Sequence, residues 1–219
     1  MDEGKILIVN LAKGKIGEDN CSLLGSMIVT KIWLSALSRA NLPEGKRRPF
    51  YLYVDEVQNF LTLSFADVLS EARKYGLHMT LAHQYTSQLD EKIRGAIFGN
   101  VGTVISFRVG IEDAELLAKE FYPVFNMNDL INLPNHHIYL KLMVDGATTQ
   151  PFNAITLPPP EKVRSYEKEI IKLCREKYSR PRKEVENELL LKSYSPYRAY
   201  DQKFPNKNTT EAKKANTLF

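Results

Sequence analysis

The sequence predicts an α/β fold with a mainly parallel sheet covered by helices on both faces. Short, nearly continuous apolar runs alternate along the chain with longer segments of helical periodicity, which is typical of buried parallel strands and their crossover helices. Hydrophobic residues make up 43% of the 219 residues and charged residues 26%. These are the proportions of a globular domain, and they exclude collagen-like, wholly disordered and disulfide-scaffold chains.

The four apolar runs expected to form strands are each bounded by charged or Gly-containing segments, and they span residues 5–11, 50–54, 77–82 and 102–109. Helices are expected at residues 20–39, 64–75, 91–98, 112–121 and 127–131. Asn20 and Ser64 are suitable amino-terminal caps, and Gly76 is a suitable helix stop.

The sequence of the last part of the chain predicts a β-hairpin followed by a helical extension. Residues 137–142 and 148–154 alternate apolar and polar side chains around Asp145-Gly146, as antiparallel strands joined by a tight turn do. Three prolines at 158–160 end the compact domain, helices are expected at 162–178 and 183–193, and residues 194–219 lack apolar periodicity. We therefore expect a domain at 1–157, a helical extension at 158–193 and a disordered tail at 194–219.

Charge is distributed unevenly between these parts. Residues 1–160 contain 15 Lys and Arg against 17 Asp and Glu, whereas residues 161–219 contain 15 against 9. A basic tail of this kind either binds a polyanion or is simply a solvated end.

Three absences indicate a cytoplasmic protein. The longest charge-free runs have 15 residues and are interrupted by polar residues, Pro or Gly, so no membrane span is expected. The acidic start at Asp2 and Glu3 is unlike a secretory signal. The two cysteines, Cys21 and Cys174, are too few for a disulfide framework or a zinc site.

Two adjacent acids, Asp55 and Glu56, directly follow the second apolar run. At the carboxyl end of a parallel strand such a pair projects into the crevice where α/β folds bind ligands. It matches the Walker B arrangement, in which the Asp holds the Mg²⁺ shell and the Glu orients or deprotonates the attacking water. Acids also occur at strand ends simply because these ends meet solvent, so the pair alone leaves both interpretations open.

Further polar residues follow the next strand. His83 and Gln84 come at its carboxyl end, and neighbouring parallel strands would place Gln84 beside Asp55 and Glu56. A neutral amide there can sense a γ-phosphate or position water, whereas His83 is expected to be structural. Arg73, next to Lys74 at the end of the preceding helix, is either a cation favoured by the helix dipole or an arginine finger.

These segments together resemble a known family. The motifs are FYLYVDEVQNF at residues 50–60, LSEARKYGL at 69–77, LAHQYTSQL at 81–89 and NVGTVISFR at 100–108. They are similar to the second half of the TraD/TraG-type coupling ATPases of conjugation and type IV secretion, which are close to the HerA–FtsK group of DNA-pumping motors. The resemblance covers about residues 3–157 and implies a partial RecA-like domain.

The resemblance implies a role for each matching residue. Asp55 would associate with Mg²⁺ through water, Glu56 would be the catalytic acid, Gln84 the sensor and Arg73 the finger acting on a neighbouring subunit. Arg108 is a weaker candidate for a nucleotide contact, with a buried, acid-paired arginine as the alternative. ATP and Mg²⁺ would be the cofactors, DNA held without sequence specificity the cargo, and a ring of like subunits the assembly. Relaxosome or type IV secretion channel proteins would be the other partners.

One family motif is missing. Gly14-Lys15-Ile16-Gly17 is rich in Gly and Lys, but the chain contains no Gly-Lys pair followed by Ser or Thr, and hence no Walker A loop. We therefore expect this chain to be inactive alone and to act as the carboxyl-terminal part of a motor. Three alternatives are a non-catalytic docking module, a HerA/FtsK-like motor outside conjugation, and a metal-dependent nuclease using Asp55 and Glu56.

Overall fold

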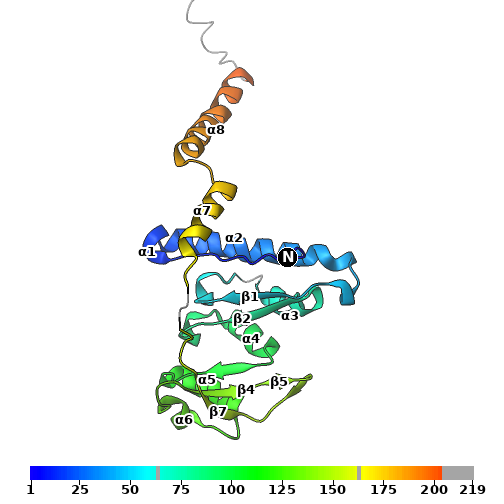
Figure 1. Ribbon diagram of the computed structural model, residues 1–219, viewed down its shortest axis with the longest axis vertical. Helices are drawn as coiled ribbons and strands as arrows, with labels where there is room; N and C mark the ends of the chain where they lie inside the picture. The colour runs from blue at the N-terminus through cyan, green and yellow to red at the C-terminus, as the bar shows by residue number, and fades with distance from the viewer. Residues whose placement is uncertain (63–64, 162–163, 204–219) are drawn as a thin grey trace, which may run out of the picture. The chain divides into compact units, whose positions relative to one another are not determined.

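The computed structural model describes residues 1–62, 65–161 and 164–203, with side chains through Lys192. The chain divides into two compact units, Met1–Pro158 and Pro159–Phe219. Figure 1 shows helices and strands interspersed along the first unit, while the described part of the second consists of helices.

The parallel sheet consists of β1 (Phe50–Val54) and β2 (Leu77–Leu81), paired in register from Phe50 opposite Leu77 to Val54 opposite Leu81. Its inner face packs against α2 (Glu18–Leu37) and α3 (Phe65–Glu71). The buried centre of this cluster is formed by Ala36, Phe65, Val68, Ala72 and Leu77. The predicted α/β class with a parallel sheet is therefore confirmed.

The other face of this sheet is bare in the described chain. Tyr51 is 61% and Tyr53 73% exposed, and the Tyr51 ring stacks on His78 at a centroid distance of 5.2 Å. Helices therefore cover one face of β1 and β2 rather than both. Parallel sheets are normally buried on both faces, so this chain supplies only part of the layers that such a sheet needs.

The connection between the two parallel strands ends as the sequence predicted. After α3 the chain continues through a 3₁₀ turn, η4 (Ala72–Tyr75), and Gly76 then adopts a left-handed conformation with φ 70°. Its N–H donates to the carbonyl of Arg73, which closes the end of the turn. The predicted cap, Ser64, lies outside the described residues.

A second group of elements completes the first unit. Helix α4 (Glu91–Asn100) is capped by Asp90, whose carboxylate accepts from the N–H of Lys92, and α6 (Met127–Ile131) begins with a capping box at Asn126. Helices α5 (Ile111–Phe121) and α6 share a buried cluster with β3 (Val104–Ser106) and β4 (His137–Lys141). Strand β7 (Phe152–Ile155) completes an antiparallel sheet of order β3-β4-β7.

The predicted hairpin forms with a divided first strand. Strands β5 (Met143–Val144) and β6 (Ala147–Thr148) are joined at Asp145-Gly146, whose φ values of 50° and 81° fit a tight hairpin turn. Just outside this turn β4 pairs antiparallel with β7.

Two strand predictions differ from the structure. Residues 5–11 form no strand, and Ile6, Leu7, Ile8 and Val9 are exposed, because the described part of the chain offers them no neighbouring strand. The run expected at 102–109 shortens to β3 and pairs antiparallel with β4 instead of joining the parallel sheet. A short helix, α1 (Lys13–Ile16), precedes α2.

One long helix bears on the expectation of no membrane span, which stays a prediction. Within the described residues one helix, Glu18–Asn41, is long and apolar enough to cross a membrane by length and composition alone. The lengths of the charge-free runs do not reveal it, because Lys31 divides them. The same helix places Val29, Ile32 and Trp33 against the cluster under the parallel sheet, so its composition alone does not assign it to a membrane.

The second unit contains α7 (Glu167–Tyr178) and α8 (Arg182–Lys203). Helix α8 extends past residue 193, where the sequence predicted the start of a disordered tail. The predicted helix start at Lys162 and the rest of the predicted tail, residues 204–219, lie outside the described residues.

Candidate functional site

The two predicted acids lie where the parallel sheet ends. Asp55 and Glu56 directly follow β1, and the ladder continues one step beyond the strands: Ala82 N–H donates to Val54 O at 2.9 Å, and Val57 N–H to Ala82 O at 3.0 Å. These bonds fix the chain after β1 to the chain after β2.

Gln84 contacts Glu56 directly. Its Nε2 donates to Glu56 Oε1 at 2.5 Å, as expected for residues following neighbouring parallel strands. Gln58 Nε2 donates to the other carboxylate oxygen, Oε2, at 2.6 Å. Two neutral amides therefore hold the Glu56 carboxylate in one orientation without neutralising its charge.

The backbone of Glu56 is unusual. It adopts the left-handed conformation, with φ 50° and ψ 46°, immediately before the 3₁₀ turn η3 (Val57–Asn59). The turn is held by Asn59 Nδ2, which donates to Glu56 O at 3.0 Å, and by Asp55 Oδ1, which accepts from Glu56 N–H at 3.0 Å. Such a conformation costs a non-glycine residue about 1 kcal/mol or more and tends to occur at functional sites.

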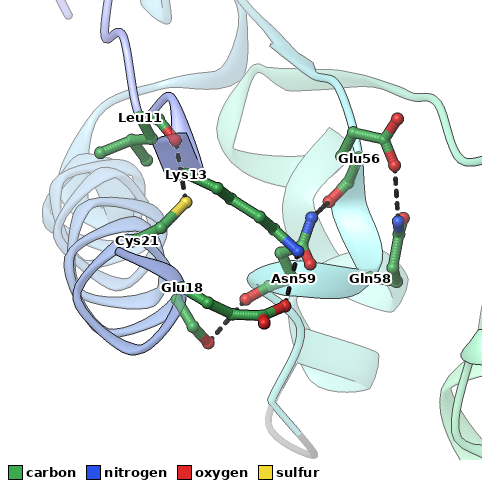
Figure 2. Close-up of polar contacts among 8 residues, drawn as sticks. Leu11, Lys13, Glu18, Cys21, Glu56, Gln58 and Asn59 are labelled. Atoms are coloured by element: carbon green, nitrogen blue, oxygen red, sulfur yellow. Dashed lines mark hydrogen bonds and ion pairs between the residues drawn. The ribbon is translucent and has the colours of Figure 1, made fainter. Parts of the chain in front are cut away.

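Helix α2 supports this turn from the side (Figure 2). Ser22 Oγ donates to Asn59 O at 2.8 Å, which fixes the far end of η3. Lys13 extends toward Asn59 in Figure 2 and pairs with Glu18 at 2.7 Å. The hydrogen bond that Lys13 donates to Glu18 is the main cause of the raised pKa of Lys13, and the charge of Glu56 adds to it.

Gln58 and Asn59 are not among the site residues predicted from the sequence, although both lie in the FYLYVDEVQNF motif at residues 50–60. Their signal is their spacing of two and three residues after Glu56. That spacing brings them back to Glu56 only because Glu56 turns left-handed, which the sequence does not reveal.

A buried polar pair anchors the segment after Gln84. Asp113, only 4% exposed, accepts from the N–H of Thr86 at 2.9 Å and from its hydroxyl group. Burial lowers the pKa of the neighbouring His83, while the negative charge of Asp113 opposes that shift. The Nδ1 atom of His83 has no hydrogen-bond partner among the described residues. His83 is thus a half-buried, neutral side chain within the loop, which fits the structural role expected for it from the sequence.

Arg73 lies away from this site. It belongs to η4, which leads into the amino end of β2, whereas Glu56 and Gln84 follow the carboxyl ends of the strands. The length of a five-residue strand, roughly 13 Å at 3.3 Å per residue, separates the two ends. Arg73 is exposed and makes no ion pair within the described residues, so it cannot act on its own Glu56 site.

Arg108 is exposed just beyond β3. No acid of the described residues forms an ion pair with it, which contradicts the alternative of a buried, acid-paired arginine. The structure does not bring it to Glu56.

The donors present fit a magnesium–nucleotide complex only in part. Mg²⁺ keeps several waters and is commonly held by one or two carboxylates together with substrate phosphates, a role that Asp55 at the strand end suits. The described residues contain no group of three or more acidic, His or Cys side chains that could hold a metal ion without phosphates. Residues 13–16 form the helix α1, not a phosphate-cradling loop.

Comparisons with known proteins identify the segment that carries this site. Residues 49–121 match a family model described as the TraM recognition site of TraD and TraG. None of the curated proteins compared matches the chain.

Solved structures of the plasmid coupling protein TrwB are similar in fold. The complex with ADP and Mg²⁺ is 19% identical with a TM-score of 0.50, over 64% of this chain and 38% of that chain. The complex with the non-hydrolysable ATP analogue ADPNP is 20% identical with a TM-score of 0.47, over 61% and 36%. This chain thus spans less than two fifths of the coupling protein that it matches.

The matched segment contains Asp55, Glu56, Arg73, Gln84 and Arg108. The resemblance to TraD/TraG-type coupling proteins, inferred from the sequence, is therefore confirmed over residues 49–121.

Proposed function

We propose that this chain is the carboxyl-terminal part of a ring-shaped ATPase that moves DNA toward a type IV secretion channel during conjugation. The observation that carries the proposal is the Glu56 carboxylate, held at the end of β1 by Gln58 and Gln84. A structural ion pair would place a cation there, whereas two amides leave the negative charge available to a water molecule.

The side chains would divide the work as follows. Asp55 holds the water shell of Mg²⁺, and Glu56 orients the attacking water and accepts its proton. Gln84 holds the Glu56 carboxylate in position to accept that proton and senses the γ-phosphate, since its amide contributes no charge of its own. ATP, when bound with Mg²⁺, supplies the transferable phosphoryl group, and its phosphates must be held by a Walker A loop outside this chain.

Arg73 would act between subunits. Its guanidinium is exposed at the opposite end of the sheet from Glu56, which suits a group that reaches the nucleotide of a neighbour in a ring. DNA, gripped through its backbone without sequence specificity, is the proposed cargo, and relaxosome or channel proteins on the cytoplasmic side are the proposed partners.

In the test, this chain is combined with the Walker A half of a related coupling protein, and the ATP turnover of two variants with substitutions at neighbouring residues is compared. Arg73→Ala should lower ATP turnover by about 10³-fold or more, the effect of losing an arginine finger. Lys74→Ala, the matched control, should leave turnover measured without DNA nearly unchanged. Mixing Arg73→Ala subunits with Glu56→Gln subunits should recover activity, because mixed interfaces pair an intact Arg73 with an intact Glu56. Equal, small effects of the two single substitutions would exclude the role in a neighbouring site.

A docking module is the second candidate. The family description of residues 49–121 as a recognition site for TraM favours it. In that case a Glu56→Gln chain would bind its protein partner as well as the wild type does, and the completed assembly would not hydrolyse ATP.

A further inference from the structure

Two basic segments lie side by side at the amino ends of β1 and β2. Arg47 Nη1 donates to the carbonyl of Lys74, which joins the loop before β1 to the turn before β2. Beneath them Arg39, only 1% exposed, donates from Nη1 to Arg48 O at 3.0 Å and to Tyr75 O at 3.2 Å. The two segments are therefore fixed against each other, and their cations keep a defined spacing.

These two segments are basic, unlike the first 160 residues taken together. Residues 39–48 and 71–76 contain six Lys and Arg against two Asp and Glu, although residues 1–160 as a whole are slightly acidic. Lys46, Arg48 and Lys74 are exposed, and none of the three forms an ion pair within the part of the chain that the structure describes. We call these three residues the amino-end patch.

Apart from Leu42, which is 41% exposed, the two segments lack the apolar anchors that a protein partner normally needs. Interfaces between proteins centre on apolar or aromatic anchors that become desolvated. The aromatic side chain here, Tyr75, is half-buried, with Arg47 at 5.6 Å and Lys74 at 5.8 Å from its ring centroid. A surface of exposed cations without an aromatic anchor suits the phosphates of a nucleic-acid backbone, which are bound through charge alone.

We propose that the amino-end patch binds the sugar–phosphate backbone of nucleic acid. The proposal rests on the proposed function and deepens it, because it assigns the contact with DNA to three residues. The patch lies at the end of the sheet opposite Glu56. Within one subunit the nucleic-acid backbone and the nucleotide would therefore bind at separate places, and nucleic acid could be held while phosphates are exchanged at the other end.

The experiment measures binding of a fluorescent single-stranded oligonucleotide to the full chain, without nucleotide, over a range of salt concentrations. The patch variant is K46Q/R48Q/K74Q. The matched control, K168Q/R175Q/K183Q, removes the same charge from α7 and α8. Each phosphate contact to a single strand contributes about 0.7 to the slope of log K against log salt. For three lost contacts, the magnitude of the slope should therefore be smaller by about 2 in the patch variant than in the wild type. If the two plots of log K against log salt meet at 1 M, the affinity of the patch variant should be lower by about 100-fold near 0.1 M salt. The control should lose much less.

A second variant, K46R/R48K/K74R, keeps the charges and should keep the affinity, which shows that a loss in the patch variant is not a loss of folding. Equal losses in the patch and control variants, a larger loss in the control, or no binding by the wild type at low salt would each overturn the proposal. So would patch-dependent binding of polyglutamate without binding of the oligonucleotide. Because the assay contains no ATP, a failure of the proposed ATPase would leave its result unaffected.

Discussion

Replacing Gly25 by Ala should destabilise the protein, although Ala is the better helix former. Gly25 is buried within α2, and a Cβ atom there would overlap the ring of Phe60, with Cγ only 2.9 Å away. Phe60 follows the η3 turn, whose end is bonded to α2 through Ser22. An added methyl group must therefore push α2 away from the turn that holds Glu56.

The expected magnitude follows from two opposing effects. Overpacking typically costs about 1–3 kcal/mol, and the rigid aromatic ring places this site near the upper end. The gain in helix propensity from Gly to Ala is about 1 kcal/mol. The net loss of about 2 kcal/mol should lower Tm by about 4–8 °C in a chain of this size, measured by thermal unfolding followed by circular dichroism.

Gly95, inside α4, provides a matched control. Nothing lies within 4 Å of a Cβ atom placed there, so Gly95→Ala should raise stability by about 0.5–1 kcal/mol through propensity alone. The pair of substitutions should thus shift Tm in opposite directions. If Gly25→Ala stabilises the protein as Gly95→Ala does, the inference that α2 packs closely against Phe60 at Gly25 is refuted. Rescue of Gly25→Ala by Phe60→Leu would attribute the loss to the ring itself.

Three further predictions concern the site and the units. The isolated chain should show no Mg²⁺-dependent ATP hydrolysis because it has no Walker A loop; turnover that Glu56→Gln abolishes would contradict this. Stability should fall as the pH is lowered from 7 to 5, because the pKa of folded His83 lies below that of the unfolded side chain and acid favours the unfolded state. His83→Gln should flatten that dependence in urea titrations. Ending the chain after Pro158 should change the Tm of the first unit by less than about 4 °C, a shift that corresponds to roughly 1 kcal/mol, since its three buried clusters lie wholly within that unit.

Features that depend on local chemistry could be predicted from the sequence. Gly76 ends its turn because a left-handed residue is needed there, and Asp145-Gly146 forms the hairpin turn for the same reason. The meeting of Gln84 with Glu56 follows from the parallel pairing of two adjacent apolar strands.

Features that depend on distant partners could not be predicted. Residues 5–11 have the composition of a buried strand, but a strand forms only where another offers its edge, and the described chain offers none to them. Strand β3 has equally apolar residues and pairs with β4, because α5 and α6 pack on that antiparallel sheet. The contact of Gln58 with Glu56 depends on the left-handed backbone conformation of Glu56, which cannot be predicted from the residue type at that position.

The bare sheet face and the restrained acid lie on the same two strands. Parallel sheets are normally covered on both faces, and β1 and β2 expose Tyr51 and Tyr53 on one of them. The Glu56 carboxylate at the end of β1 is already held by Gln58 and Gln84 within this chain. Under the proposed function, a phosphate-binding element that packs on the bare face would meet a carboxylate that is already oriented, so covering the sheet and binding the nucleotide would be one event.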